Sequence, residues 1–166
     1  MDDEDGVILR DGDRYTLTFT RRLKHPIDKV WAALTVPERI ADWLATATIT
    51  PGPGLGASFA LHFAEGDYRM AGKIVAYEPP RLIAWTWPDG HPPDSVVRFE
   101  LAPDGAGCVL ILTQDRQRLE HLQDVAAGWH THLEGLPFAA EGVHAPWSAE
   151  REANHAHRYA VAAKAV

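Results

Sequence analysis

Two helix-like segments that lie far apart in the chain constrain its fold more than any other feature. Residues 26–35 open with Pro26, which favours the first turn of a helix, and their apolar side chains recur at three- and four-residue steps. Pro37 then starts a second short helix, and residues 119–140 carry the same period over a longer stretch. Between these segments lie short β-prone runs separated by Gly and Pro. This order predicts a strand, two short helices, an antiparallel meander and one long C-terminal helix, with a hollow between sheet and helix.

Alternation of apolar and polar residues predicts the strands. In residues 14–23, Tyr15, Leu17 and Phe19 alternate with threonines, which is typical of a half-buried strand. Short links that contain Gly and Pro make an antiparallel sheet of six or seven strands the simplest topology. The further strands are expected at residues 58–63, 68–78, 81–87, 97–101 and 108–114.

The length of 166 residues predicts one α+β domain. Residues 1–12 are expected to form a flexible acidic tail, and residues 13–142 the folded domain. In the C-terminal tail, residues 143–166, Ser148 can cap a helix that runs from residue 149 to about residue 163. That helix is rich in alanine and has little area to bury, so it could cover the sheet, form a homodimer interface or stay loose.

Composition argues against several classes of partner. The net charge of −7 and the absence of a long basic run argue against nucleic acid. The acidic N-terminus differs from a secretory signal, and no apolar stretch approaches the roughly 20 residues that span a bilayer. The one cysteine, Cys108, cannot form an internal disulfide and fits a reducing compartment. We therefore expect a cytoplasmic protein without membrane insertion.

An ordered series of short motifs resembles the START-like (SRPBCC) superfamily, whose fold is the helix-grip. The chain is most similar to the branch named after the activator of heat shock protein 90 ATPase homologue, over about residues 14–140. The resemblance implies a curved antiparallel sheet that grips a long C-terminal helix around an internal cavity. It transfers no catalytic set, and relatives often have His where this chain has Gln114. The motifs that carry the resemblance are residues 30–38, 42–43, 72–82, 85–87, 107–113 and 128–136.

Aromatic residues are the main candidates for a binding site. Trp31 is expected in the core. A place in the core and a place in the cavity wall are equally expected for Trp43, Trp85, Trp87 and Trp129. Small-molecule pockets are lined mainly by such apolar side chains with a few polar groups. The predicted ligand-binding residues are Trp43, Phe59, Leu61, Phe63, Trp85, Trp87, Phe99, Leu112, Gln114, Trp129 and Leu133.

The sequence offers no metal or nucleophile motif. His130 and His132 are two residues apart on a helix and point in different directions, so they cannot share one ion. Cys108 lies on the same face of its predicted strand as the apolar residues, so it is expected to be buried. Four polar residues on or near strands are expected at the surface, unless they point inward to a partner or serve a function: Arg69, Glu100, Gln114 and Asp115. We therefore predict no catalytic residue, no metal and no cofactor.

Three functions compete at this stage. The favoured one is a non-catalytic carrier or sensor of a small hydrophobic ligand (a lipid, a polyketide-like molecule or an aromatic), with the long helix and the Pro-Gly loop at residues 51–54 acting as lids. The first alternative is a cyclase- or hydrolase-type enzyme that acts on a hydrophobic substrate in the same cavity. The second alternative is a module that stimulates a chaperone ATPase, as the family name implies.

Overall fold

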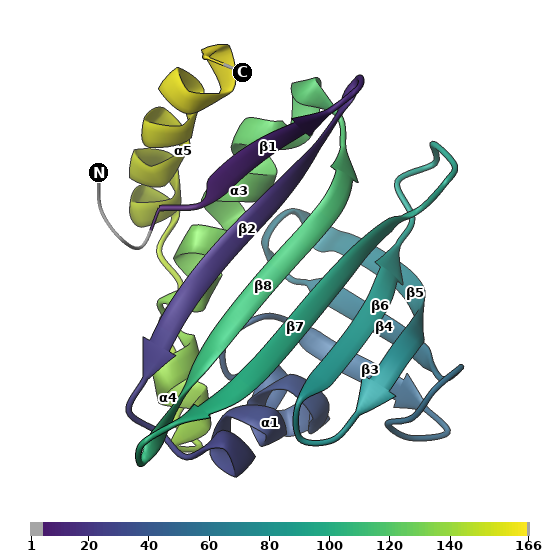
Figure 1. Cartoon of the computed structure of the whole chain (residues 1–166), viewed down its shortest axis with the longest axis vertical. Coiled ribbons are helices and arrows are strands. Elements are labelled where there is room, and N and C mark those ends of the chain that lie inside the picture. The colour runs from purple at the N-terminus through teal and green to yellow at the C-terminus, as the bar shows by residue number, and fades with distance from the viewer. Residues whose placement is uncertain (1–4, 166) are drawn as a thin grey trace.

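The computed structural model describes residues 5–165 and has the α+β architecture expected from the sequence (Figure 1). The ends of the two expected tails, residues 1–4 and residue 166, lie outside the described residues. The strands are β1 (Val7–Asp11), β2 (Arg14–Leu23), β3 (Thr46–Thr50), β4 (Ser58–Phe63), β5 (Tyr68–Glu78), β6 (Leu82–Trp87), β7 (Ser95–Asp104) and β8 (Gly107–Gln117). The helices are α1 (Ile27–Thr35), α2 (Pro37–Ala41), α3 (Leu119–Leu133), α4 (Leu136–Ala140) and α5 (Ala149–Lys164), with a short 3-10 helix, η1, at Glu65–Asp67.

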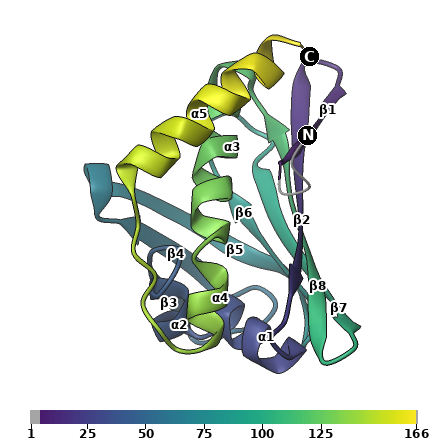
Figure 2. The same cartoon turned by 90° about the vertical axis from the view of Figure 1, so that its left-hand side faces the viewer.

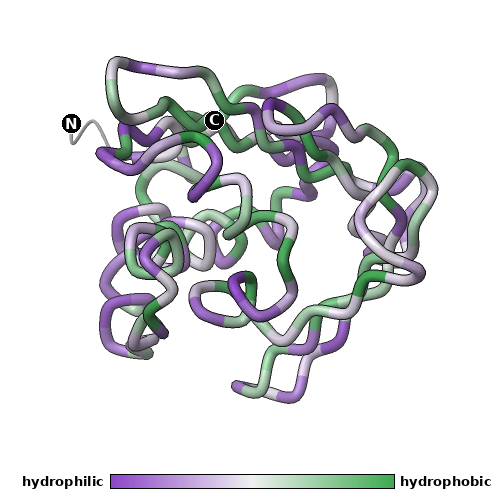
Figure 3. The backbone as a smooth tube through the Cα atoms, turned by 90° about the horizontal axis from the view of Figure 1, so that it is seen from below, coloured by the Kyte–Doolittle hydropathy of each residue, from purple (hydrophilic) through white to green (hydrophobic). Residues whose placement is uncertain are grey.

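All the strands join one antiparallel sheet in the order β1-β2-β8-β7-β6-β5-β4-β3. Most of the links are hairpins, and the main crossover carries the chain from β2 through α1 and α2 to β3 at the opposite edge. Figure 3 shows hydrophobic and hydrophilic residues alternating along the strands, as expected for a sheet with one buried face. In Figure 2, α3 lies against the concave face of this curved sheet. The helix-grip expectation is therefore confirmed.

The strand count is higher than predicted. The expected acidic tail is wrong for residues 7–11, which form β1 and pair with β2 through a turn at Gly12, where φ is +64°. The other addition is β3, whose TATIT sequence alternates exposed and half-buried residues. Both are edge strands of five residues, and they lack the strong apolar alternation that identified the central strands.

The single long helix predicted over residues 119–140 is also wrong, because the chain breaks into α3 and α4. Pro137 provides the reason: it has no backbone N–H to donate, and its ring conflicts with the carbonyl of Leu133. At the break, a Cβ on Gly135 would lie 2.8 Å from the Cβ of Ala145. Gly135 thus lets the chain after α4 pass close to the break, rather than bringing the helix closer to the sheet.

The C-terminal tail packs on the domain as α5. Ser148 caps it as predicted, because its Oγ accepts a hydrogen bond from the Arg151 N–H. The buried Tyr159 attaches α5 to both neighbouring elements: its hydroxyl accepts from the Gly6 N–H at 2.7 Å and lies 2.8 Å from Nδ1 of His130 on α3. The hydroxyl hydrogen can donate to Nδ1 of His130 in the tautomer that has no hydrogen on Nδ1. In Figure 2, α5 crosses in front of the upper part of α3.

Two further sequence-based expectations concern Cys108 and membrane association. Cys108 is completely buried, as predicted, and burial raises the pKa of its thiol. Within residues 5–165, no helix has both the length and the apolar character needed to cross a membrane.

The buried His130 should make the fold sensitive to acid. Burial, and then the neighbouring His155, lower the pKa of His130 from 6.5 to about 4. Below pH 6.5 the unfolded chain therefore binds a proton that the folded chain does not, and stability falls until the pH reaches about 4. We expect this group to account for up to about 3 kcal/mol of unfolding free energy across that window.

Chemical denaturation at a series of pH values should measure this loss. His130→Gln cannot titrate there, so its unfolding free energy should fall less steeply between pH 6.5 and 4 than that of the wild type. The exposed His157→Gln is the matched control and should follow the wild-type curve. Parallel curves for wild type and His130→Gln would contradict the assignment.

Candidate functional site

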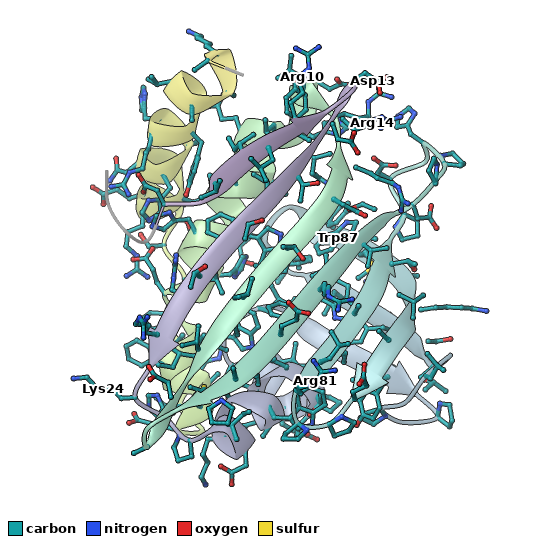
Figure 4. All side chains as sticks on the ribbon, viewed as in Figure 1. Arg10, Asp13, Arg14, Lys24, Arg81 and Trp87 are labelled. Atoms are coloured by element: carbon teal, nitrogen blue, oxygen red, sulfur yellow. The ribbon has the colours of Figure 1, made fainter. Side chains whose placement is uncertain are left out.

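A pocket of about 610 Å³ opens between α3 and one end of the sheet. It lies at the Trp87 end of β6, and Figure 4 shows Arg81 and Trp87 towards opposite ends of that strand. Pockets for small organic ligands have about this volume. The lining residues are Leu44, Phe63, Glu65, Tyr68, Trp87, Asp89, Ser95, Gln114, Gln117, His121, Asp124, Val125, Gly128, Trp129, His132, Trp147 and Glu152.

One face of α3 forms a wall of this pocket. His121, Val125, Gly128 and His132 follow one another at four-, three- and four-residue steps, which places them in one row along the helix. At Gly128 the helix does not approach the sheet closely, because a Cβ at this position would meet no atom within 4 Å. The missing side chain leaves open space in the middle of the wall.

A bulge at the end of β8 brings a second glutamine to the pocket. Across the β2–β8 pair, Leu17 faces Gln114 and Tyr15 faces Gln117, so β8 has one extra residue there. Arg116 takes up the extra residue with φ at +53°. Gln117 therefore faces inward like Gln114, and its amide donates to Ser95 Oγ at 3.0 Å and to the Asp115 carbonyl at 3.1 Å. These two hydrogen bonds use the NH₂ group of Gln117, so its Oε1 remains available as an acceptor for the pocket.

An aromatic wall lines the pocket, formed by Phe63, Tyr68 and Trp87 of the sheet together with Trp129 of α3. The ring of Trp87 stacks on Tyr68 at 6.4 Å and meets Trp129 edge-on at 6.0 Å. Its indole N–H donates to the Tyr68 hydroxyl at 3.1 Å, so the polar edges of this pair satisfy each other. A ligand in the pocket would therefore contact mainly the apolar ring surface of this wall.

A hydrogen bond between Trp129 and Gln114 joins α3 to the sheet at the back of the pocket. The indole Nε1–H, which can only donate, lies 2.6 Å from Oε1 of Gln114. This contact determines which end of the carboxamide is oxygen. The Gln114 side chain is 96% buried, and within the described chain its NH₂ group has no hydrogen-bond partner. Two donors are thus directed into the pocket without acceptors.

His132 presents a hydrogen-bond acceptor to the pocket, whereas Gln114 presents donors. Its Nδ1 lies 3.0 Å from the carbonyl oxygen of Trp43, so Nδ1 carries the hydrogen and Nε2 has a free lone pair. Burial lowers the pKa of His132, while the Trp43 carbonyl and the charge of Glu65 act in the opposite sense. A neutral imidazole that presents an acceptor nitrogen is the result.

Carboxylates surround the mouth. They are Glu65 on η1, Asp89 after β6, Asp124 on α3 and Glu152 on α5. Burial, followed by the charges of Asp124 and Glu65, raises the pKa of Glu152, whereas a hydrogen bond with Trp147 lowers it. The negative charges of Asp124 and Glu65 therefore act on Glu152 across the opening.

The structure divides the predicted ligand-binding residues into two groups. Phe63, Trp87, Gln114 and Trp129 line the pocket. The others lie in the packed core behind it, where Phe59 stacks on Trp85 at 4.5 Å and Trp43 meets Phe99 edge-on at 6.2 Å. These core residues, each at most 5% exposed, are Trp43, Phe59, Leu61, Trp85, Phe99, Leu112 and Leu133.

Several residues that line the pocket were not predicted from the sequence. Most of the polar residues that were expected at the surface are at least partly exposed. Glu65 and Asp89 lie in turns, while Trp147 and Glu152 lie in the tail, where no periodicity marks an inward direction. Gln117 was missed because the predicted strand ended at Gln114 and a bulge leaves no clear sequence signal. Of the four polar residues expected at the surface, Arg69, Glu100 and Asp115 have side chains that are 71%, 39% and 38% exposed. For Gln114 the surface expectation is wrong, because this residue is only 4% exposed.

The expected lid is also different. The loop at residues 51–54 joins β3 to β4 at the end of that hairpin opposite to Leu44 and Phe63, so it does not border the pocket. Trp147 and Glu152, in the segment that leads into α5, border it instead. No group of three or more His, Cys, Asp or Glu side chains among residues 5–165 is arranged to hold a metal ion.

Comparisons with known proteins place this geometry in a family. Residues 24–141 match the family described as activator of Hsp90 ATPase homolog 1-like proteins. The crystal structure of CalU16 from Micromonospora echinospora is 26% identical, with a TM-score of 0.74 over 96% of this chain and 94% of that chain. A search of curated protein sequences found no match.

Two further solved structures are similar. The protein encoded by gene BPP1335 from Bordetella parapertussis is 30% identical, with a TM-score of 0.72 over 95% of this chain and 90% of that one. Protein MLL2253 from Mesorhizobium loti is 28% identical, with a TM-score of 0.68 over 76% of this chain and 96% of that one. The family match, the helix-grip sheet and the pocket beside α3 agree, and the chain belongs to the activator of Hsp90 ATPase homolog 1-like family of START-like ligand-binding domains.

Proposed function

We propose that this protein binds a small, largely apolar and aromatic molecule in the pocket between α3 and the sheet, and carries or senses it without breaking a bond. The observation that carries the proposal is the pair of unpartnered N–H donors that Gln114 holds beside the aromatic wall. These N–H groups border the open pocket, and a ligand that supplies a carbonyl or hydroxyl oxygen would accept hydrogen bonds from them in place of water.

The apolar surface is sufficient for useful affinity. Covering about 300 Å² of apolar ligand surface at roughly 25 cal/mol per Å² gives about 7 kcal/mol before the cost of association. Stacking on Trp87 and Trp129 adds to this term, since both indoles are already held by hydrogen bonds. A preformed wall loses little entropy when the ligand arrives.

His132 supports a second candidate, an enzyme of the cyclase type. Its Nε2 could accept a proton from a substrate carbon next to a carbonyl, while the Gln114 N–H groups donate to the oxygen that gains charge. The lowered pKa of His132 keeps the imidazole unprotonated and able to act as a base near neutral pH.

Gly128 allows the pocket to be filled without disturbing the core. Gly128→Leu should place a side chain in the open space and abolish binding of a neutral naphthalene probe, measured by calorimetry. Gly128→Ala is the matched control and should retain most of the binding. Both variants should melt at or above the wild-type temperature, because replacing Gly inside a helix with Ala is worth up to about 1 kcal/mol.

Two results would contradict the proposal: unchanged probe affinity in a well-folded Gly128→Leu protein, or no binding by the wild type. Native mass spectrometry of the purified protein adds an independent measure. A bound small molecule seen with wild type and Gly128→Ala should be absent from Gly128→Leu.

The enzymatic candidate has a different signature. Turnover of a polyketide-like substrate panel should fall by at least 100-fold in His132→Gln, since general-base catalysis contributes roughly that much or more. Calorimetric binding of the same substrates should change little. Turnover that is equal in His132→Gln and wild type would exclude His132 as the base, and no turnover by the wild type would leave the carrier as the only proposal.

A further inference from the structure

We infer that the molecule bound in this pocket carries a positive charge, a protonated amine on an apolar or aromatic body, and that the carboxylates at the mouth select it. This inference rests on the proposed function and specifies the chemical class of the ligand. The aromatic wall would hold the body, the amide of Gln114 an oxygen at the inner end, and the mouth the cationic group.

The charge of the lining is one-sided. Its residues include the carboxylates of Glu65, Asp89, Asp124 and Glu152, and none is Lys or Arg. Its basic side chains are His121, at the start of the α3 row, and the half-buried His132. A cation that enters the mouth therefore approaches several negative charges and no guanidinium or ammonium group.

These carboxylates also lack the ion pairs that usually explain acidic clusters. Across residues 5–165, no Lys, Arg or His nitrogen is recorded in a salt bridge with Glu65, Asp124 or Glu152, whereas Glu78, Glu120 and Glu134 all have such partners. Burial, and after it the repulsion from Asp124 and Glu65, raises the pKa of Glu152. A bound cation would relieve this repulsion.

The aromatic wall is compatible with a cation as well as with apolar groups. Ring faces of Trp and Tyr attract ammonium groups electrostatically, and Trp87 and Tyr68 line the same pocket as Glu65. Trp147, 37% exposed, adds an indole on the α5 side next to Glu152. Carboxylates combined with indole rings disfavour an anionic ligand twice, through charge repulsion and through the negative ring faces.

A matched series of probes tests the charge preference directly. The probes are 2-(1-naphthyl)ethylamine, 2-(1-naphthyl)ethanol and 1-naphthylacetate, which share one ring system and differ in charge. Dissociation constants come from titrating ¹⁵N-labelled protein and following the indole N–H signals, with Trp87 and Trp129 reporting on the pocket. We expect the amine to bind about tenfold more tightly than the alcohol and the acetate more weakly than both. The preference should shrink in 0.5 M NaCl, where the screening length is only a few Å.

A charge-matched pair of variants locates the effect. Asp124→Asn/Glu152→Gln removes two charges at the mouth and should reduce the preference for amine over alcohol to about threefold or less, with the alcohol affinity unchanged. Asp13→Asn/Glu38→Gln removes two exposed charges elsewhere and should keep the tenfold preference. Figure 4 shows Asp13 at the tip of the β1–β2 hairpin, well separated from Trp87.

The outcomes separate this inference from the proposed function. Equal binding of all three probes, or tightest binding of the acetate, would overturn the charge preference and leave the apolar pocket supported. A preference that survives in Asp124→Asn/Glu152→Gln would overturn the assignment to these carboxylates. If no probe moves the signals of Trp87 and Trp129, the proposed function fails and the inference fails with it.

Discussion

The hydrogen bond from the Trp129 indole to Gln114 is the contact on which the arrangement of this molecule depends. It joins the middle of α3 to β8 across the concave face, at 2.6 Å and away from solvent. On one side of it the gap is filled, since Trp129 meets Phe99 at 5.9 Å and Trp85 at 6.5 Å. On the other side lies the pocket. The same bond leaves the amide hydrogens of Gln114 unpaired and directed towards that pocket, so one contact supports both the fold and the candidate site.

The gap between sheet and helix is therefore half core and half pocket, and each half has a local cause. Aromatic residues fill the end near α1 and α2, where Trp43 donates to the Ala33 carbonyl at 2.8 Å. At the other end, Gly128 removes a side chain from α3 and the bulge at Arg116 turns Gln117 inward. The tail then closes around this end, because Tyr159 attaches α5 to α3 and to the N-terminal segment. A carrier needs this combination of a rigid half and an open half.

Much of the fold follows from local pattern. The limits of β2 and β5 agree with the alternation of their residues, and the Ser148 cap of α5 is where its side chain predicts it. In the site, Phe63, Trp87 and Trp129 could be proposed because large rings on an inward strand or helix face line either the core or a pocket. Gln114 could be proposed as one of the few polar groups that such a pocket contains. The alternation of residues along a strand, however, cannot distinguish a side chain in the core from one that lines the pocket. Trp85 and Trp87 share one strand face, yet Trp85 is 1% exposed in the core while Trp87 borders the cavity.

The sequence alone determined the family, the antiparallel sheet with its gripping helix and the aromatic character of the interior, because hydrophobic period and turn residues act over a few neighbours. Only the tertiary structure decided which end of the gap stays open, that Pro137 and Gly135 break the last helix, and that four carboxylates from separate elements meet at one mouth. Residues from separate elements come together only through the packing of helices and strands that are far apart in the chain. Glu65 and Glu152 share no local signal, and the charge of Glu65 acts on Glu152 because η1 and the first turn of α5 border the same pocket.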